Sequence, residues 1–397
     1  MVETVLFVVS GLATALAAAM AVAQRRLLRV VAPPPGRVLP AVSILKPLKG
    51  VDAGLEDNLR SFFTLDYPAY EVVLGAHDAD DAALAVARRV AAEHPEVPSR
   101  VVVDAREVGY NPKVNNLANL LRHARHEVIL ISDSNVRVAP GMLAGMVAHL
   151  EQPGVGLVSS PIAGGAGRGA GALLDAFQLD TFVMGGVAAL DRFFGAVCVV
   201  GKSMLLRRGV LDAIGGFAHL SRYLAEDQVC GQEVAALGLR VVVTGGTVTN
   251  VPGRQTVRQF AARHLRWAKI RRRISPLGYL GELLLNPSVP AIGAVAVART
   301  WEAAAFLAAV VAVSGLVAAV AERSLGVRRS LLAYPVLVLA RDLLVGVLWA
   351  VPWISPRVRW RGNAFVLRRR TLLVAAGGRP PVTLPSAPRE TLASGAA

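Results

Sequence analysis

HEVILISDSNVRV, residues 126–138, decides the fold, because a four-residue aliphatic run leads directly into a polar cluster that begins near Asp133. Four similar runs occur elsewhere in the chain: AVSILK (41–46), YEVVLGAHD (70–78), SRVVVD (99–104) and GVGLVSSP (154–161). Stretches with helical patterns, such as 82–93 and 140–150, fall between them. Continuous Val/Ile/Leu strands that alternate with helices predict an α/β domain whose mainly parallel sheet is covered on both faces.

In such a sheet the ligand binds at the carboxyl ends of the strands. The polar residues that end the runs are therefore the first candidates for chemistry: Lys46, residues 77–81, Asp104 and residues 133–135. Carboxylates at these positions suggest a nucleotide bound through a divalent metal, since Mg²⁺ and Mn²⁺ take oxygen ligands and bridge phosphates. Asp133 fits the metal role best, with an Asx-turn at the strand end as the structural alternative.

Two further carboxylates stand at the starts of predicted helices. Asp81 closes HDADD (77–81) and precedes the helix from residue 82, so its alternative role is an N-cap. Asp227 lies in LAEDQVCGQEVAALGL (224–239), near the start of a helix with apolar 3.6 periodicity. There, Asp227 and Glu226 would also complement the helix dipole without any catalytic role.

A basic helix follows in ARHLRWAKIRRR (262–273). The i, i+3, i+4 spacing of Arg263, Arg266 and Trp267 places two guanidinium groups and an indole on one helical face. Such a helix can bind lipid headgroups at a membrane surface, and residues 271–273 would do so. Its guanidinium groups can also neutralise a departing diphosphate. Both roles can hold on one helix.

The composition indicates a membrane protein with a soluble middle. The 397 residues are 54% apolar with a mean hydropathy of +0.48, and the excess lies at the two ends. Residues 1–23 carry one charge and are long enough to span a bilayer, and Arg25, Arg26 and Arg29 follow them. We therefore expect an outward N-terminus and a cytoplasmic middle domain. The net charge of +15 fits an anionic membrane face, because no nucleic-acid-binding motif is found.

Two cysteines, Cys198 and Cys230, lack the spacing of a zinc site or a disulfide framework. The predicted domains are a transmembrane helix (1–24), a linker rich in proline (25–40), a catalytic domain (41–253), a basic interfacial helix (254–281), membrane segments (282–354) and a basic cytoplasmic tail (355–397).

The apolar blocks 283–298, 303–321 and 331–354 are not equivalent, and only the second is an unambiguous span. An even number of crossings would return the basic tail to the cytoplasm, so we expect two full crossings plus one interfacial or re-entrant segment. The last block contains Arg341 and Asp342, which are costly in hydrocarbon. These two side chains should pair with each other or contact the interfacial side of the catalytic domain.

Several longer motifs share one order and spacing: VSILKPLKGVD (42–52), LDYPAYEV (65–72), HDADD (77–81), GYNPKVNNL (109–117), SDSNVRV (132–138), LAEDQ (224–228) and RHLRW (263–267). In these motifs the chain resembles the ceramide glucosyltransferases, glycosyltransferase family 21, which are membrane-bound inverting GT-A enzymes that use UDP-glucose. The resemblance covers roughly residues 40–275 and extends more weakly to WRGNAFVL (360–367).

The resemblance implies roles for individual residues. Asp81, Asp133 and Asp227 correspond to the family's three key aspartates, and Arg263-x-x-Arg266-Trp267 to its (Q/R)xxRW motif. UDP-sugar binding is implied for Lys46, Pro47, Asp81, Lys113 and Asp133, with Mg²⁺ or Mn²⁺ at Asp133. Asp133 belongs to a D-S-N triplet and not to a full DxD, so this motif offers the metal a single carboxylate. The region 163–199 also lacks the histidine associated with animal relatives, which leaves acceptor recognition open.

An inverting transfer needs one carboxylate to accept the proton of the acceptor hydroxyl. Asp227 is the expected base and Glu226 the alternative, since adjacent helical residues point about 100° apart. The acceptor, ceramide or another lipid, would enter from the bilayer between the basic helix and the C-terminal apolar segments. A hopanoid acceptor or an N-acetylglucosamine donor is the alternative within this class. A transporter or scaffold is disfavoured because few polar residues lie in the apolar blocks, and a polysaccharide synthase would need more spans.

Overall fold

The computed structural model describes residues 1–28, 38–360 and 363–375, and its main element is a seven-stranded sheet of order β3-β2-β1-β4-β8-β6-β9. The five predicted strands form β1 (Val42–Pro47), β2 (Tyr70–Ala76), β3 (Ser99–Val103), β4 (Val128–Ser132) and β6 (Val155–Ser159). The first four pair in parallel, and β6 pairs in parallel with β9 (Arg240–Val243). Only β8 (Ser203–Arg207) runs antiparallel to its neighbours β4 and β6. The predicted mainly parallel sheet is confirmed.

Helices cover both faces of this sheet, each over its own hydrophobic core. One core includes residues of α2 (Leu55–Arg60), α3 (Ala83–Glu93) and α5 (Met142–Leu150). The other includes residues of α4 (Pro112–Leu121), α8 (Arg208–Ala213), α9 (Gly216–Leu220) and α10 (Glu226–Ala236). Successive strand residues alternate between the cores, as Ile44 and Leu45 do on β1. This explains why the central strands are apolar throughout.

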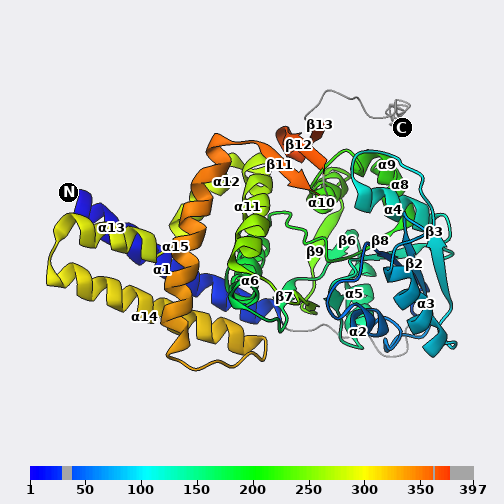
Figure 1. The fold of residues 1–397 in the computed structure, drawn as a ribbon, viewed down its shortest axis with the longest axis horizontal. Coiled ribbons are helices and arrows are strands. Elements are labelled where there is room, and N and C mark those ends of the chain that lie inside the picture. The colour runs from blue at the N-terminus through cyan, green and yellow to red at the C-terminus, as the bar shows by residue number, and fades with distance from the viewer. Residues whose placement is uncertain (29–37, 361–362, 376–397) are drawn as a thin grey trace, which may run out of the picture.

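A second layer joins the sheet to the membrane helices. A small sheet of β5 (Val136–Arg137), β10 (Val248–Asn250) and β7 (Ile162–Gly164) leads into a long helix built from α6 (Ala170–Gln178), the π-helical turn η1 (Leu179–Val183) and α7 (Met184–Phe194). The basic helix α11 (Val257–Ile274) packs beside α6 and starts with a capping box between Thr256 and Gln259. Figure 1 shows α6 and α11 between the sheet and the outer helices.

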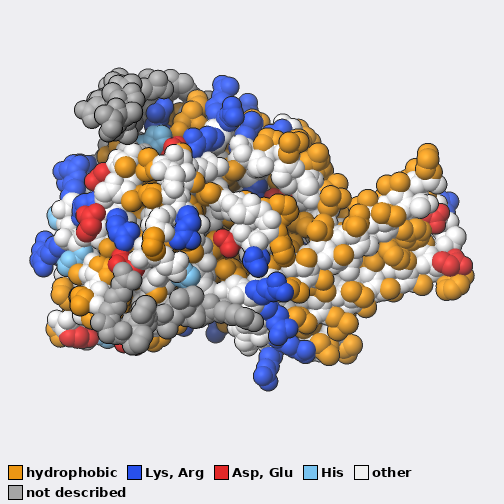
Figure 2. Space-filling view, turned by 180° about the vertical axis from the view of Figure 1, so that it is seen from behind, with side chains coloured by type: hydrophobic (Ala, Val, Ile, Leu, Met, Phe, Trp, Pro, Cys, Tyr) orange, Lys and Arg blue, Asp and Glu red, His pale blue; other side chains and the backbone are white. Residues whose placement is uncertain are grey.

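Three helices form a membrane arm, which we define as α1 (Val2–Leu27), α13 (Ser288–Ala298) and α14 (Trp301–Ser324). They pack on one another and project away from the sheet, whereas α15 (Ala333–Ile354) crosses the base of the arm beside α11 (Figure 1). Apolar side chains cover the arm, and Lys and Arg gather at its base (Figure 2). The surface is that of a membrane protein.

Four helical segments are long and apolar enough to cross a membrane: α1, 170–194, α14 and α15. In 170–194, 61% of the apolar window is buried inside the protein, against 22% in α1, so this segment serves as core. A further pair, Pro276–Leu285 and Ser288–Ala298, passes the same test with a bend of 63°. The bend lies at residues 286–287, where Pro287 interrupts the helix, and it is consistent with a broken span or a re-entrant loop.

The C-terminal part differs from the prediction. The segment expected to be a tail from residue 355 forms a three-stranded antiparallel sheet of β11 (Arg357–Trp360), β12 (Asn363–Leu367) and β13 (Leu373–Ala375). Val358, Phe365 and Leu367 bury against the catalytic domain, and this burial offsets the cost of ordering a basic chain. Residues 376–397 and most of the predicted linker (29–37) lie outside the described residues.

The predicted basic helix 254–281 is also two helices. It divides into α11 and α12 (Pro276–Gly281) at Ser275, whose hydroxyl caps the second helix through Gly278 N–H. Proline at the first position of α12 starts a new helix, because it has no N–H with which to continue the old one.

Candidate active site

Asp133 follows β4 at the carboxyl end of the sheet and contacts two ammonium groups. Its Oδ1 lies 2.8 Å from Lys113 Nζ on α4, and its Oδ2 lies 2.8 Å from Lys202 Nζ in the turn before β8. Burial alone would raise the pKa of Asp133, but the two ammonium groups hold it well below its usual range. This carboxylate is therefore fixed in its charged form.

Lys202 is a residue that sequence reasoning missed. The antiparallel strand β8 inserts between β4 and β6 and thereby brings Lys202 to Asp133 from 69 residues away. Nothing in the local sequence GKS (201–203) reports that strand order. A second oxygen, Asn135 Oδ1, lies 2.7 Å from the same ammonium group.

Lys46 lies beneath Asp133. The side chain is fully buried, its ammonium donates to the Asp133 backbone carbonyl, and it sits 3.6 Å from the centre of the Phe62 ring. Burial lowers the pKa of Lys46 well below its ordinary value. In this position Lys46 supports the turn that carries Asp133, and Pro47 beside it ends β1.

Asp81 joins two loops at the same edge of the sheet. Its carboxylate accepts hydrogen bonds from the backbone N–H of Gly50, at 2.9 and 3.0 Å, and of Ala83, at 3.0 Å. The side chain is 3% exposed and lies 4.0 Å from Lys49 Nζ. Asp81 thus links the loop after β1 to the start of α3. Its hydrogen bond from Ala83 N–H is similar to the N-cap role that the sequence offered as the alternative.

Two adjacent carboxylates at the start of α10 are held in different ways. Both oxygens of Glu226 are engaged, one with Lys113 Nζ at 2.9 Å and the other with Asn111 Nδ2 at 3.2 Å. Within the described part of the chain, Asp227 accepts hydrogen bonds from backbone N–H groups, those of Gly201 at 2.7 Å and of Gln228 at 2.8 Å. Burial, followed by the negative charge of Glu226, raises the pKa of Asp227 to about 6. Asp227 is therefore set to exchange a proton near neutral pH.

The basic helix reaches this cluster through Arg263. Its Nη1 lies 2.9 Å from Asp175 Oδ2, and His264 Nε2 lies 2.9 Å from Asp175 Oδ1. The guanidinium also lies over the Trp267 ring, 4.7 Å from its centre. Burial lowers the pKa of Arg263, while the charges of Asp175 and Asp133 oppose that shift. Arg266 is on the same helix and is partly buried.

Asp175 is a second residue that sequence reasoning missed. It is fully buried on α6, in a segment where the sequence is otherwise apolar, and it orients both Arg263 and His264. The sequence did contain a sign of its role: Asp175 is a single acid inside an apolar helix, and a buried acid needs a cationic partner.

The small C-terminal sheet braces the segment that precedes the two carboxylates. Thr371 accepts hydrogen bonds from Leu224 N–H through its carbonyl and from Ala225 N–H through its hydroxyl, both at 3.1 Å. The Tyr110 and Phe365 rings meet with centroids 6.0 Å apart. The sheet of β11, β12 and β13 thereby supports the wall of the site.

The structure brings together Lys113, Asp133 and Asp227, with Arg263 beside them and Lys46 underneath. Two other predicted candidates lie elsewhere, towards the β3 edge of the sheet. His77 lies 3.8 Å from Glu107, and Asp104 pairs with Arg106. Both are strand-end groups with surface partners.

A metal at Asp133 would have one carboxylate from the protein. Within the described residues, no group of three or more His, Cys, Asp or Glu side chains could hold a metal. Mg²⁺ is often bound by only one or two carboxylates together with substrate phosphates and water. The Lys202 ammonium, which lies between Asp133 and Asn135, marks a position where two oxygens already surround a cation. The donor set therefore fits a metal whose remaining ligands come from phosphate and water.

Comparison with known sequences places these residues in a family context. The sequence profile of glycosyl transferase family 21 matches residues 5–373. Ceramide glucosyltransferase 1 of Caenorhabditis elegans is 30% identical over 246 residues, which are 61% of this chain and 52% of that protein. The ceramide glucosyltransferase of Komagataella phaffii is 33% identical over 192 residues, 43% of this chain and 38% of its own. The chain spans about half the length of the first of these relatives and less of the second.

Among solved structures, a mannosyltransferase from Pyrobaculum calidifontis in complex with GDP-Man and Mn²⁺ matches with a TM-score of 0.56. The match covers 87% of this chain and 98% of that one at 20% identity, which shows a common fold. The predicted GT-A fold is confirmed by this likeness together with the sheet order.

Proposed function

Because the chain belongs to glycosyltransferase family 21, we propose that it transfers glucose from UDP-glucose to the primary hydroxyl of ceramide, which yields β-glucosylceramide and UDP. Two relatives with about 30% identity carry the name ceramide glucosyltransferase, which supports the acceptor and the sugar. The alternative is the same transfer of glucose or N-acetylglucosamine to a hopanoid or another bacterial lipid. In either case we propose that the enzyme acts in a membrane with its catalytic domain in the cytoplasm. The Ala-, Arg- and Val-rich composition suggests a bacterium, and hence its inner membrane.

The observation that carries the proposal is the contrast between two carboxylates of one site. Asp133 lies 2.8 Å from each of two lysine ammonium groups, which hold it charged, whereas Asp227 accepts backbone N–H groups beside Glu226 and its pKa is raised to about 6. When their environments shift the pKa values of two acids in opposite directions, the acid with the lowered pKa is suited to bind cations and the acid with the raised pKa is suited to accept a proton.

In the proposed reaction the donor diphosphate lies against the cationic groups around Asp133. The ammonium groups of Lys113 and Lys202 lie there. Arg263 is close enough that the negative charge of Asp133 opposes the lowering of its pKa by burial. Guanidinium and ammonium groups aimed at the diphosphate would stabilise the charge that develops on the leaving UDP. Arg266 and Trp267 would assist from the same helix, while Asp81 and Lys46 with Pro47 shape the loop for the nucleoside.

Asp227 then accepts the proton of the acceptor hydroxyl as that oxygen attacks the anomeric carbon opposite UDP. Glu226 is committed to Lys113 and Asn111, so it positions the ammonium group of Lys113 and leaves the base role to Asp227.

We further propose that Mg²⁺ or Mn²⁺ binds at Asp133, with Asn135 as a second oxygen donor. The metal would supply charge neutralisation on the diphosphate. Calorimetric titration of UDP with and without Mn²⁺ tests this, because Asp133→Ala should abolish the metal-dependent part of the affinity. Equal UDP affinity with and without metal in the wild-type protein would remove the metal from the site.

The direct test of the reaction is mass spectrometry of the lipids made by the purified full chain. UDP-glucose with ceramide should give a hexosylceramide whose anomeric proton has the coupling of a β-glycoside in NMR spectra. Parallel reactions would contain UDP-N-acetylglucosamine or a hopanoid alcohol. Product in one of these alone would favour the alternative, and an α-linked product would contradict the inverting mechanism.

A further inference from the structure

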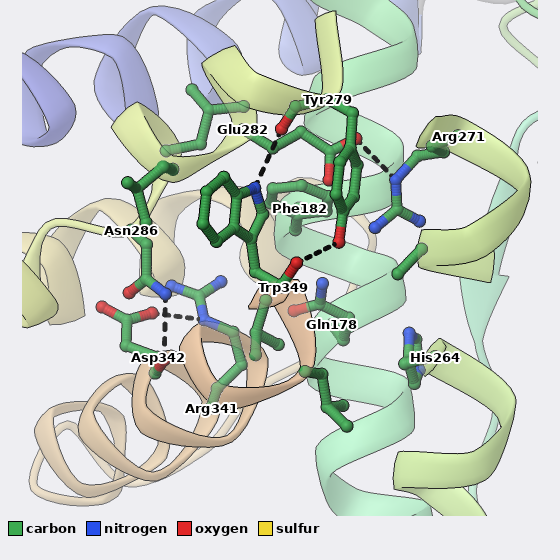
Figure 3. A pocket seen from close by; sticks show the side chains of 15 residues that line it. Gln178, Phe182, His264, Arg271, Tyr279, Glu282, Asn286, Arg341, Asp342 and Trp349 are labelled. Carbon is green, nitrogen blue, oxygen red and sulfur yellow. Dashed lines mark hydrogen bonds and ion pairs between the residues drawn. The ribbon is translucent and has the colours of Figure 1, made fainter. Parts of the chain in front are cut away.

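A cavity separate from the carboxylate cluster lies between α6–η1, α11, α15 and the segment formed by α12 and η2 (Glu282–Leu285) (Figure 3). Its open volume, including the mouth, is about 520 Å³. Much of its wall is apolar or aromatic, with contributions from Phe182, Leu285, Val345, Leu348 and Trp349. The Tyr279 and Trp349 rings stack at one side with centroids 6.0 Å apart.

Two buried amide oxygens in this wall lack a partner. Gln178 is 2% exposed and Asn286 is 5% exposed, and neither Gln178 Oε1 nor Asn286 Oδ1 accepts a hydrogen bond from any part of the chain that the structure describes. Asn286 Nδ2 donates to the Asp342 carbonyl at 2.9 Å, which fixes the direction of the amide. Buried acceptors normally find donors, so a ligand with N–H or O–H groups would complete the cavity.

The charged groups of the same wall are already paired. Arg341 Nε lies 2.7 Å from Asp342 Oδ1, and Arg271 Nε lies 2.6 Å from Glu282 Oε1. A neutral head with hydrogen-bond donors would satisfy the two open acceptors, Gln178 Oε1 and Asn286 Oδ1, whereas a phosphate diester has no N–H or O–H group to donate to them. The chemistry of the wall thus favours an uncharged polar head over a phospholipid.

A second cavity adjoins the first on the side of the membrane arm. It is lined by residues of α1 and α14, among them Met20, Val317 and Ala318, and it shares Phe182, Leu285 and Arg341 with the first cavity. The membrane arm, to which α1 and α14 belong, is apolar on its surface (Figure 2). A lipid could therefore place its head beside Gln178 and a chain along the arm.

The loop that follows α7 lies against the start of α10, where the proposed base stands. Burial, followed by the charges of Asp227 and Asp191, raises the pKa of the Cys198 thiol to about 12, while the charge of Arg271 opposes this shift. Cys198 thus lies within electrostatic reach of both Asp227 and the cavity residue Arg271. The geometry agrees: Gly201 in the same loop donates its N–H to Asp227, while His264 of the cavity wall shares Asp175 with Arg263 of the active site.

We propose that this cavity is the acceptor subsite, in which Gln178 Oε1 and Asn286 Oδ1 accept hydrogen bonds from the N–H and O–H groups of a neutral lipid. A hydrocarbon chain of that lipid occupies the adjoining cavity. The proposal rests on the proposed function for the identity of the reaction, and it adds the residues that select the acceptor.

Kinetics of the full chain in nanodiscs test the role of the two amides. Gln178→Leu and Asn286→Leu should each raise KM for ceramide about three- to tenfold, as expected for one lost hydrogen bond, and leave KM for UDP-glucose unchanged. Gln24→Leu is the matched control, because Gln24 is also a buried glutamine with an unpaired Oε1 among the membrane helices but lines neither cavity. Equal ceramide KM values in all three variants would overturn the proposal.

A binding measurement on the wild-type chain separates this subsite from the reaction. Ceramide brominated on the acyl carbon next to its amide, and so close to the head, should quench tryptophan fluorescence saturably, and Trp349→Phe should remove most of that quenching. If ceramide quenches Trp349 but yields no glycosylated product, the proposed function fails while the subsite stands. If brominated phosphatidylcholine quenches Trp349 as strongly as ceramide, or if ceramide does not quench it at all, the subsite proposal fails.

Discussion

At the scale of single residues, Asp227 and Glu226 differ in their partners. Both oxygens of Glu226 bind side chains, whereas Asp227 accepts hydrogen bonds from backbone N–H groups. Asp227→Asn should retain UDP-glucose binding, because donor contacts come from Asp133, its lysines and the loop around Asp81. Turnover should fall by about 10²- to 10⁴-fold, the usual contribution of a general base. Glu226→Gln should be milder, since it keeps a hydrogen bond to Asn111 and loses only one of the two carboxylate partners of Lys113. Turnover and UDP affinity measured on the same lipid acceptor decide between the two residues.

The pH profile checks the same assignment. A base must be deprotonated to act, so kcat/KM should be level above the pKa of Asp227, about 6, and fall as pH drops through it. This acidic limb should vanish in Asp227→Asn and persist in Glu226→Gln. A dead Glu226→Gln beside a near-normal Asp227→Asn would assign the base role to Glu226.

Gly201 holds Asp227 in place through close packing. A Cβ built on Gly201 would lie 2.5 Å from Asp227 Oδ2, and the Gly201 N–H donates to the same oxygen. Gly201→Ala should therefore displace the carboxylate and lower kcat by at least tenfold, about 1.4 kcal/mol of lost transition-state stabilisation. Gly141→Ala is the control, because a Cβ there meets nothing within 4 Å. A Gly201→Ala enzyme with wild-type kcat would show that the position of Asp227 does not limit catalysis.

At the scale of elements, the aliphatic strands could be predicted because each ends in recognisable polar residues. β1, β2, β3, β4 and β6 all lie where periodicity placed them. What sequence did not reveal was β8, since an antiparallel strand inserted into a parallel sheet depends on long-range pairing. Lys202 was missed for the same reason, although Lys113 and Asp133 beside it were found. The C-terminal sheet was missed because its arginines resemble a solvated tail.

Helix α15 carries the predicted charge pair, and its pairing is confirmed. Arg341 Nε donates to Asp342 Oδ1 at 2.7 Å, and Arg341 Nη1 reaches Thr181 on η1 at 3.3 Å. Asp342→Ala should destabilise the fold by about 3–5 kcal/mol, because it leaves a buried guanidinium unpaired. The double variant Arg341→Leu/Asp342→Asn should recover much of that loss, since it removes the charge and keeps an acceptor for Ser288 N–H. Thermal unfolding in detergent measures the stability of both variants. Equal Tm values for Asp342→Ala and the double variant would mean that the unpaired guanidinium does not cause the loss of stability.

At the scale of the whole molecule, the arm is polarised along its length. α1 and α14 both begin at the far tip and end at the base of the arm (Figure 1). Each has an acid in its first turn, Glu3 and Glu302, and arginine in its last turn, Arg25 with Arg26 and Arg323. Arginine beside a span marks the cytoplasmic side of a membrane. The base of the arm and the sheet domain should therefore lie in the cytoplasm.

This orientation leads to three crossings. α1 enters from outside, the bent pair ending in α13 returns towards the tip, and α14 comes back to the base, so that α15 is left at the membrane surface beside α11. We therefore expect alkaline phosphatase fused to the N-terminus to be active and green fluorescent protein fused to the C-terminus to fluoresce. Cysteine labelling along α15 should be periodic, with one face protected by its packing on α11 and α14, whereas labelling along α14 should be uniformly low. Uniform protection of α15 together with an inactive N-terminal phosphatase would require a fourth crossing and would place the sheet domain and the chain end on opposite sides.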